Sequence, residues 1–393
     1  MICLNDHPVL ARVFVIAFVL IHLASSIPAQ NVFVSSRNGH AVKLYDLATG
    51  NYIKDFVPAG SGGLLFPQEL LWHPDGYLLV VGRGNSAIKK YDGETGAYLG
   101  NFTTGYALDN PTKTTIWKDS LIYVSQWGVS QNKIARFNLK TGVFVDEFTK
   151  MGIANGDGHD WDAFDNLYVA QFFDGQNGRV MKFDTDGNFI GIFVSSTILQ
   201  GPVNLWFNDD KSSLFVVDWT LGQVLKFNGI SGAFQSILIS GLANTEGFTF
   251  DNQGNLYVCD WSDNIVYRYS FVTNTLTPFI QTGGLLAPNS ILIREAVISS
   301  ANQVDWSDKI AIQVLPNPAQ ERLEISYELL EKTSVAIQLL DMQGKVITQL
   351  AAITQPAGKH QQTLSIPDLP AGVYLCRLQL GIGIATKKVM IGA

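Results

Sequence analysis

Six positions near the start of regularly recurring strand segments carry polar side chains, and five of the six suit metal binding or proton transfer. They are Glu69, Lys113, His159, Asn204, Glu246 and Asn289. Carboxylate and amide oxygens around a ring suit a hard cation such as calcium. The candidate calcium ligands are Glu69, Asn204, Glu246 and Asn289, and His159 is the candidate general acid or base. Lys113 adds a positive charge, and one histidine cannot form a three-histidine zinc site. The alternative is that these groups only line a polar channel.

A second set of six residues follows the same strand segment in each copy and combines aromatic rings with guanidinium groups. Its members are Arg37, Arg83, Trp127, Phe172, Trp219 and Trp261. Aromatic faces with arginines suit the stacking of sugar rings or the recognition of a peptide. We predict that this set binds a ligand; the alternative is that its rings pack between repeats. Asp218 and Asp260 either join the set or close their own turns through bonds to the backbone.

Composition and missing motifs exclude several classes of function. The chain has 27 Lys and Arg against 34 Asp and Glu, and no basic cluster that would follow a phosphate backbone, so nucleic acid is not an expected partner. GxSxG, HExxH and phosphate-binding glycine motifs are absent from the sequence. The acidic stretch at residues 157–162 lacks EF-hand spacing, and we expect it to connect two repeats.

The elements that position both sets belong to a repeat of 42–47 residues. A short apolar strand recurs with its central valine at Val34, Val80, Val124, Val169, Val216 and Val258. Each copy continues with a strand that ends in an aromatic residue, a turn such as Thr49-Gly50, a third strand, and a segment that in four copies holds a tryptophan. Four short strands per repeat are typical of a propeller blade, so residues 30–294 predict an all-β, six-bladed β-propeller.

The strand motifs LYVAQ and LYVCD, together with the TG or DG turns of most copies, resemble the repeats of NHL-type six-bladed propellers. The repeat begins in the second strand of a blade, at Asn31, and ends with an unmatched first strand at residues 288–293. We therefore expect these two ends to complete one blade and close the ring. The tryptophans Trp72, Trp117, Trp161 and Trp206 are expected to fill the spaces between blades.

The N-terminus has the pattern of a secretory signal peptide. Arg12 precedes the apolar run at residues 13–20, and small residues follow at Ser26 and Ala29. Residues 1–29 are therefore expected to be removed, and the run is too short for a membrane span. Cys3 belongs to this segment, while Cys259 and Cys376 fall in different predicted domains, so a disulfide framework is not expected.

After a linker at residues 295–309, residues 310–393 alternate apolar and polar positions, which predicts a small immunoglobulin-like β-sandwich. Four motifs occur there in order: PNPA at 316–319, DMQGKVI at 341–347, LPAGVY at 369–374 and KKV at 387–389. This set resembles the type A C-terminal sorting domain of the type IX secretion system. The resemblance implies that the secretion machinery is a partner and that the protein is released or attached at the surface of a Gram-negative bacterium.

Three functions are compatible with these patterns. The leading hypothesis is a secreted propeller that binds a glycan, peptide or protein on the face that carries both residue sets. The alternative is a calcium-type lyase or lactone hydrolase at the mouth of the central channel. A scaffold without a ligand is the third. The sequence leaves open whether the protein is an enzyme, and convergence of the candidate oxygens on one point would favour the second hypothesis.

Overall fold

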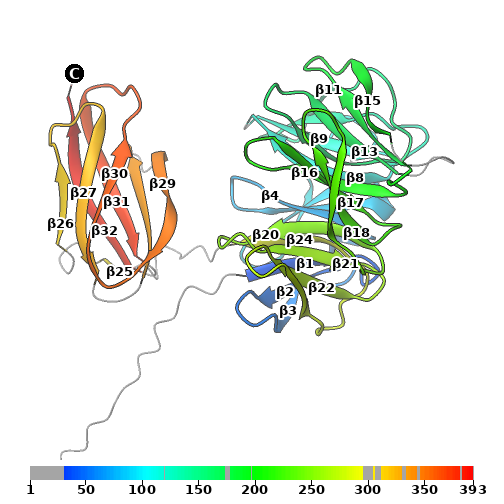
Figure 1. Cartoon of the computed structure of the whole chain (residues 1–393), viewed down its shortest axis with the longest axis horizontal. Helices are drawn as coiled ribbons and strands as arrows, with labels where there is room; N and C mark the ends of the chain where they lie inside the picture. The colour runs from blue at the N-terminus through cyan, green and yellow to red at the C-terminus, as the bar shows by residue number, and fades with distance from the viewer. Residues whose placement is uncertain are drawn as a thin grey trace, which may run out of the picture. The chain divides into compact units, whose positions relative to one another are not determined.

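The structure is a computed structural model of the chain. It describes residues 31–118, 120–172, 178–195, 197–294, 304–305, 311–329, 333–342, 346–380 and 383–392. The predicted signal peptide and nearly all of the predicted linker lie outside these ranges. The described residues form two compact units, one within residues 29–297 and one within residues 298–393. In Figure 1 the first unit runs from blue to yellow-green and the second from gold to red.

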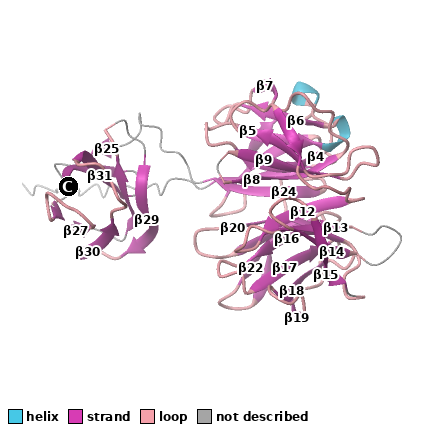
Figure 2. Cartoon of the chain, turned by 90° about the horizontal axis from the view of Figure 1, so that it is seen from above, coloured by secondary structure: helices cyan, strands magenta, loops and turns pink. Residues whose placement is uncertain are grey.

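The first unit is a β-propeller. Its described residues form six four-stranded antiparallel sheets, and strands dominate the fold in Figure 2. From inner to outer strand, the first two sheets are β24 (Pro288–Arg294), β1 (Asn31–Ser36), β2 (Ala41–Asp46) and β3 (Tyr52–Val57), and then β4 (Pro67–Trp72), β5 (Leu78–Gly82), β6 (Ala87–Tyr91) and β7 (Tyr98–Asn101). The third and fourth sheets are β8 (Pro111–Trp117), β9 (Leu121–Gln126), β10 (Ala135–Asn138) and β11 (Phe144–Glu147), and then β12 (Gly156–Trp161), β13 (Leu167–Gln171), β14 (Arg179–Phe183) and β15 (Phe189–Ser195). The fifth and sixth sheets are β16 (Pro202–Phe207), β17 (Ser213–Asp218), β18 (Gln223–Asn228) and β19 (Phe234–Ile239), and then β20 (Thr245–Phe250), β21 (Leu256–Asp260), β22 (Ile265–Ser270) and β23 (Thr275–Ile280). The innermost strands β24, β4, β8, β12, β16 and β20 contact one another in a closed cycle.

The repeated strand motif forms the second strand of each sheet. These strands are buried along almost their whole length, because neighbouring sheets pack on both of their faces. The outer strands are mostly exposed instead, with buried residues only near their ends, as strands at the outer edge of a sheet are. The apolar valine motif therefore marks the packed centre of every sheet.

The two ends of the propeller share one sheet, which confirms the predicted closure. β24 pairs antiparallel with β1, with Ile293 opposite Val32 and Ile291 opposite Val34. Ile291 is 1% exposed and packs in one cluster with Val34 and Tyr257 of the neighbouring sheet. The last strand thus closes the ring by backbone pairing and by apolar contact.

The aligned tryptophans pack between sheets, as expected. Trp117 of β8 stacks on Trp161 of β12 with ring centroids 4.5 Å apart. Trp206 of β16 contacts Phe248 of β20 at 4.3 Å. The acidic stretch at residues 157–162 was wrongly expected to be a connection, because most of it lies in the inner strand β12. Only its last residue, Asp162, closes a turn, by accepting the N–H groups of Phe164 and Asn166.

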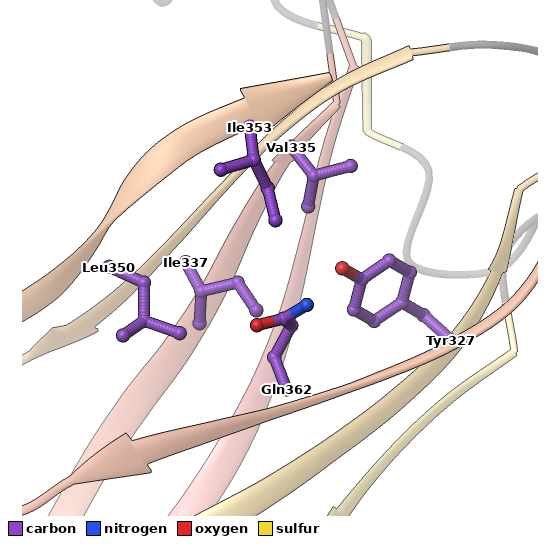
Figure 3. A pocket seen from close by; sticks show the side chains of 6 residues that line it. All are labelled: Tyr327, Val335, Ile337, Leu350, Ile353 and Gln362. Carbon is purple, nitrogen blue, oxygen red and sulfur yellow. The ribbon is translucent and has the colours of Figure 1, made fainter. Parts of the chain in front are cut away.

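The second unit is a two-sheet β-sandwich. One sheet has the order β25 (Val304–Asp305), β32 (Gly383–Ile391), β31 (Gly372–Leu380), β28 (Thr333–Leu340) and β29 (Val346–Gln355); the other has β26 (Ile312–Leu315), β27 (Arg322–Leu329) and β30 (Gly358–Ser365). Buried residues of both sheets form one core. A hollow of about 230 Å³ lies between the sheets, where Tyr327 and Gln362 face Val335 and Ile337 (Figure 3). Cys376 is buried here and Cys259 in the propeller, and both are free thiols.

Candidate functional site

Polar side chains from four inner strands converge at the centre of the propeller. We call this group the central polar cluster; its members are Gln68, Glu69, Lys113, Glu246, Asn289 and Ser290. Lys113 Nζ lies 3.0 Å from Glu69 Oε2 and 3.2 Å from Glu246 Oε1. Asn289 Nδ2 donates to Glu246 Oε1 at 2.8 Å, and Ser290 Oγ donates to Glu69 Oε1 at 2.8 Å. Since these strands belong to different sheets, the cluster ties the ring together at its centre.

The ammonium group of Lys113 lies between the carboxylates that the sequence predicted as calcium ligands. Glu69, Glu246 and Asn289 do come together, but Lys113 supplies the positive charge at that point. Asn204 instead donates its side-chain N–H to the backbone carbonyl of Glu246 at 3.4 Å. Within the described ranges, no three His, Cys, Asp or Glu side chains gather as a metal-binding group. This geometry favours an internal ion pair over a divalent cation.

Burial and charge act together on the acids of this region. Burial raises the pKa of Glu69, although the nearby charge of Lys113 opposes that rise. The pKa of Lys113 is raised as well, because two carboxylates share its charge and outweigh burial. Asp157 is 1% exposed, and burial together with the charge of Glu246 raises its pKa well above the ordinary value. Asp157 Oδ1 and Asn289 Oδ1 are buried and have no hydrogen-bond partner among the described residues.

The six predicted channel positions are not equivalent, contrary to our expectation. Counted from the first residue of its strand, Glu69, Lys113 and Asn204 are third, Glu246 and Asn289 second, and His159 fourth. Each inner strand has a register shift just after its first pair, such as that between Pro67 and Glu69. A β-bulge of this kind changes which face a side chain takes. The bulge therefore explains why sequence spacing did not give the correct alignment.

His159 is a buried link between two sheets. Its Nε2 lies 2.8 Å from Thr115 Oγ1 and its Nδ1 lies 2.6 Å from Ser125 Oγ, so hydroxyls of the neighbouring sheet engage both ring nitrogens. Its place in the strand corresponds to that of Leu70 and Ile291, which are core residues. Burial lowers the pKa of His159 to about 4. A neutral imidazole with both nitrogens bonded has a structural role here.

Acid should destabilise the propeller through His159. Its pKa is about 4 in the folded protein against about 6.5 for an unperturbed histidine, so between these values the unfolded chain binds a proton that the folded chain does not. This stabilising contribution is complete above pH 6.5 and is lost as the pH falls, by about 2 kcal/mol at pH 5. Urea unfolding at pH 7 and pH 5 should show a smaller pH dependence for His159→Gln than for the wild type. If the free energy of unfolding had the same pH dependence in both proteins, His159 would not be the source of the acid sensitivity.

The second predicted set forms a continuous series of contacts from Arg83 round to Arg37, which we call the rim circuit: Arg37, Arg83, Trp127, Phe172, Trp219 and Trp261. Consecutive aromatic rings have centroid distances of 4.9, 6.2 and 5.9 Å. The guanidinium of Arg83 lies 4.7 Å from the Trp127 ring, and that of Arg37 lies 6.0 Å from the Trp261 ring. Burial lowers the pKa of Arg37, and the charge of Arg83 lowers it further, as expected for neighbouring cations. All six side chains are half-exposed.

The backbone holds every member of the rim circuit in the same way. Each residue donates its N–H to a carbonyl in the loop that leads into the inner strand; Trp219 bonds to Gly201 and Trp261 to Asn244, at 2.8 and 2.7 Å. Asp218 and Asp260 brace these loops, because their carboxylates accept backbone N–H groups of Gly201 and Ala243. These aspartates are therefore structural. The rim circuit and the start of the inner strands lie on the same side of each sheet, as predicted.

Four residues of the site were missed from the sequence. Gln68 connects the two layers, because it accepts from Arg37 Nε at 3.2 Å and donates to Glu246 at 2.6 Å. Ser290 and Asp157 can be identified as candidates only from the strand pairing, when each inner strand is aligned by the residue that lies opposite the central valine of the second strand. Phe66 lies under Arg37, with its ring centroid 4.9 Å from the guanidinium. Phe66 directly precedes Pro67, the first residue of β4, and this position before a strand was the sequence signal that could have identified it.

Comparisons with known proteins support the fold and the export route. The solved structures that resemble the chain include a nidogen/laminin complex (17% identity, TM-score 0.56, 68% of this chain and 99% of that chain) and a protein of unknown function from Bacteroides caccae (15% identity, TM-score 0.54, 67% and 98%). No curated protein sequence matches this one. Among the described residues no helix is long and apolar enough to cross a membrane.

The C-terminal unit has a family match. Residues 313–392 match the secretion system C-terminal sorting domain, which includes all four motifs noted in the sequence. That domain directs cargo to the type IX secretion machinery. The chain is therefore a β-propeller protein with a type IX sorting domain, secreted or displayed at the cell surface of a Gram-negative bacterium.

Proposed function

We propose that this protein is a secreted or surface-displayed binding module whose rim circuit takes a glycan, peptide or protein. The observation that carries the proposal is the continuous series of half-exposed aromatic and arginine side chains from Arg83 round to Arg37. Fixed backbone bonds hold each of them, so little conformational entropy is lost on binding. Tryptophan and arginine are also the residues that contribute most at binding surfaces. The propeller is of NHL type in this proposal, and residues 1–29 are removed during export.

The enzymatic alternative, a calcium-type lyase or lactone hydrolase, has less support. It needs free carboxylates for the cation and a histidine that titrates near neutral pH. Lys113 already pairs with Glu69 and Glu246, and the pKa of His159 is about 4. Calcium bound in equimolar amount to the purified protein would favour this alternative. A pure scaffold would leave the half-exposed rim rings without a role.

Removing rim tryptophans should abolish tight binding. Arrays of glycans and peptides probed with the mature protein identify a ligand, and calorimetry then gives its affinity for variants. Trp127→Ala and Trp261→Ala should each weaken binding at least about tenfold, because a central aromatic contact contributes more than about 1.4 kcal/mol. Tyr98→Ala is the matched control, since Tyr98 is 39% exposed on the outer strand β7. Loss of binding in the control with wild-type affinity in the rim variants would refute the proposed site.

A further inference from the structure

The rim circuit has two chemically different sides. Arg37 and Arg83 lie on adjacent sheets, and Phe66 connects them. The Phe66 ring packs under the Arg37 guanidinium, while the Phe66 carbonyl accepts the backbone N–H of Arg83 at 3.1 Å. The remaining members, from Trp127 to Trp261, form an arc of aromatic rings that contacts an arginine at each end. Positive charge is thus confined to one side and ring faces to the other.

Among the residues that the structure describes, no carboxylate is in direct contact with either guanidinium group. Arg83 makes no side-chain hydrogen bond or ion pair with any residue that the structure describes, and Arg37 bonds only to the amide oxygens of Gln68 and Asn38, both at 3.2 Å. By contrast, Arg136 binds Asp146 through two nitrogens at 2.6 Å. Arginine forks bind carboxylates strongly and in a defined geometry. Two neighbouring, half-exposed arginines without such a partner are complementary to an anion supplied by a ligand.

Arg83 is better placed than Arg37 to hold that anion. Gln68 links Arg37 to Glu246, and the charge of Glu246 partly offsets that of Arg37. The Arg83 guanidinium lies over the Trp127 ring and makes no hydrogen bond or ion pair with the described residues, although its charge acts on the buried Asp157. The N–H donors of Arg83 are therefore more available to a ligand than those of Arg37.

The aromatic arc favours a sugar over a peptide as the carrier of the anion. A peptide that binds an exposed sheet needs free backbone donors and acceptors. The six rim residues have already given their N–H groups to loop carbonyls. Flat, half-exposed tryptophan faces offer apolar stacking instead, and a sugar ring has an apolar face of that kind.

We infer that the rim circuit binds acidic glycans, with a uronic-acid carboxylate held by Arg83 and Arg37 and the sugar rings stacked along the arc from Trp127 to Trp261. This inference rests on the proposed binding function and specifies its ligand. It also predicts that the protein binds a charged sugar more tightly than an uncharged analogue of the same shape, because the uncharged analogue leaves the arginines without a partner.

The test compares charged and uncharged forms of one probe. The mature full-length protein is titrated by calorimetry, in chelator, with tetramers of galacturonate, mannuronate, guluronate and glucuronate, and with the methyl ester of each. At least one acid should bind, and its ester should bind about tenfold more weakly or worse. Arg83→Gln should weaken binding of the acid about tenfold and leave ester binding unchanged. Arg268→Gln is the control, because Arg268 is an exposed arginine that lies over an aromatic ring away from the rim.

A second variant, Phe66→Asn, tests whether the contact between Phe66 and Arg37 affects ligand binding without affecting folding. Phe66 has a φ of 48°, a conformation that a bulky residue adopts at a cost, whereas the equivalent positions in the next two sheets are Asn110 and Asn155 with φ near 50°. Phe66→Asn should therefore keep or raise the melting temperature, yet lower affinity for the acid several-fold as Arg37 loses its support. Unchanged affinity in this correctly folded variant would count against the arginine pair.

The outcomes distinguish this inference from the proposed function. Equal affinity for acid and ester, or full binding by Arg83→Gln, overturns the acidic-sugar assignment. Arginine-dependent binding of a polyglutamate peptide with no uronate binding also overturns it. In either case a different ligand that depends on Trp261 leaves the proposed binding function standing. Both fail if no ligand's affinity depends on the rim circuit.

Discussion

Replacing Lys113 with methionine is expected to lower the free energy of unfolding by about 3–5 kcal/mol, because it leaves buried carboxylates without their counter-charge. Lys113 is 3% exposed and contacts both Glu69 and Glu246. Methionine keeps most of the volume, so the loss reports the charge rather than a cavity. Denaturant unfolding followed by tryptophan fluorescence measures the effect, since seven of the eight tryptophans lie within residues 31–294.

Lys118→Met is the matched control for this variant. Lys118 forms an ion pair with Asp165 at 2.6 Å, but its side chain is 62% exposed, so its removal should cost about 1 kcal/mol or less. Adding Glu69→Gln to Lys113→Met should recover part of the loss, because one uncompensated carboxylate is removed. A Lys113 variant as stable as the control would show that the central polar cluster does not hold the ring together.

Removing the closing strand should abolish cooperative unfolding of the propeller. A chain that ends after residue 287 loses β24, which exposes the inner edge of β1 and deletes Ile291 from the shared cluster. It also loses Asn289 and Ser290, which bind Glu246 and Glu69. An open edge and a broken central cluster favour partly folded, aggregation-prone states.

A chain that ends after residue 297 isolates the effect of the strand. It lacks the C-terminal unit equally but keeps β24, and the propeller unit is bounded at that residue. Calorimetry should give one sharp transition for this longer chain and a broad or absent transition for the shorter one. Two equally sharp transitions would mean that β24 does not close the ring.

The sequence was informative about the propeller wherever burial dictates residue type. The second strand of each sheet is buried on both faces, so it tolerates only a narrow set of apolar residues and repeats visibly at Val34, Val80 and the later valines. The phase of that repeat was sufficient to predict the pairing of β24 with β1. The rim circuit was found for the same reason, because each member directly follows this constrained strand.

The inner strands could not be aligned from the sequence. They face a polar centre, where Glu, Lys, Asn or Thr are all acceptable if partners exist, so composition does not mark equivalent positions. A bulge near the start of each strand then shifts the faces. As a result His159 was grouped with the central acids, although its partners are Thr115 and Ser125. The contact of Lys113 with Glu69 and Glu246 spans three sheets and has no local signature.

The most direct test of the rim circuit as the ligand site is hydroxyl-radical footprinting of the mature protein with and without the ligand identified on arrays. Trp127, Trp219 and Trp261 should lose reactivity when the ligand is bound, because it covers their half-exposed rings. Tyr52, Tyr98 and Phe234, which are 39–41% exposed on outer strands, should react equally in both samples. Protection of the outer-strand aromatics with unchanged reactivity at the rim would contradict the account.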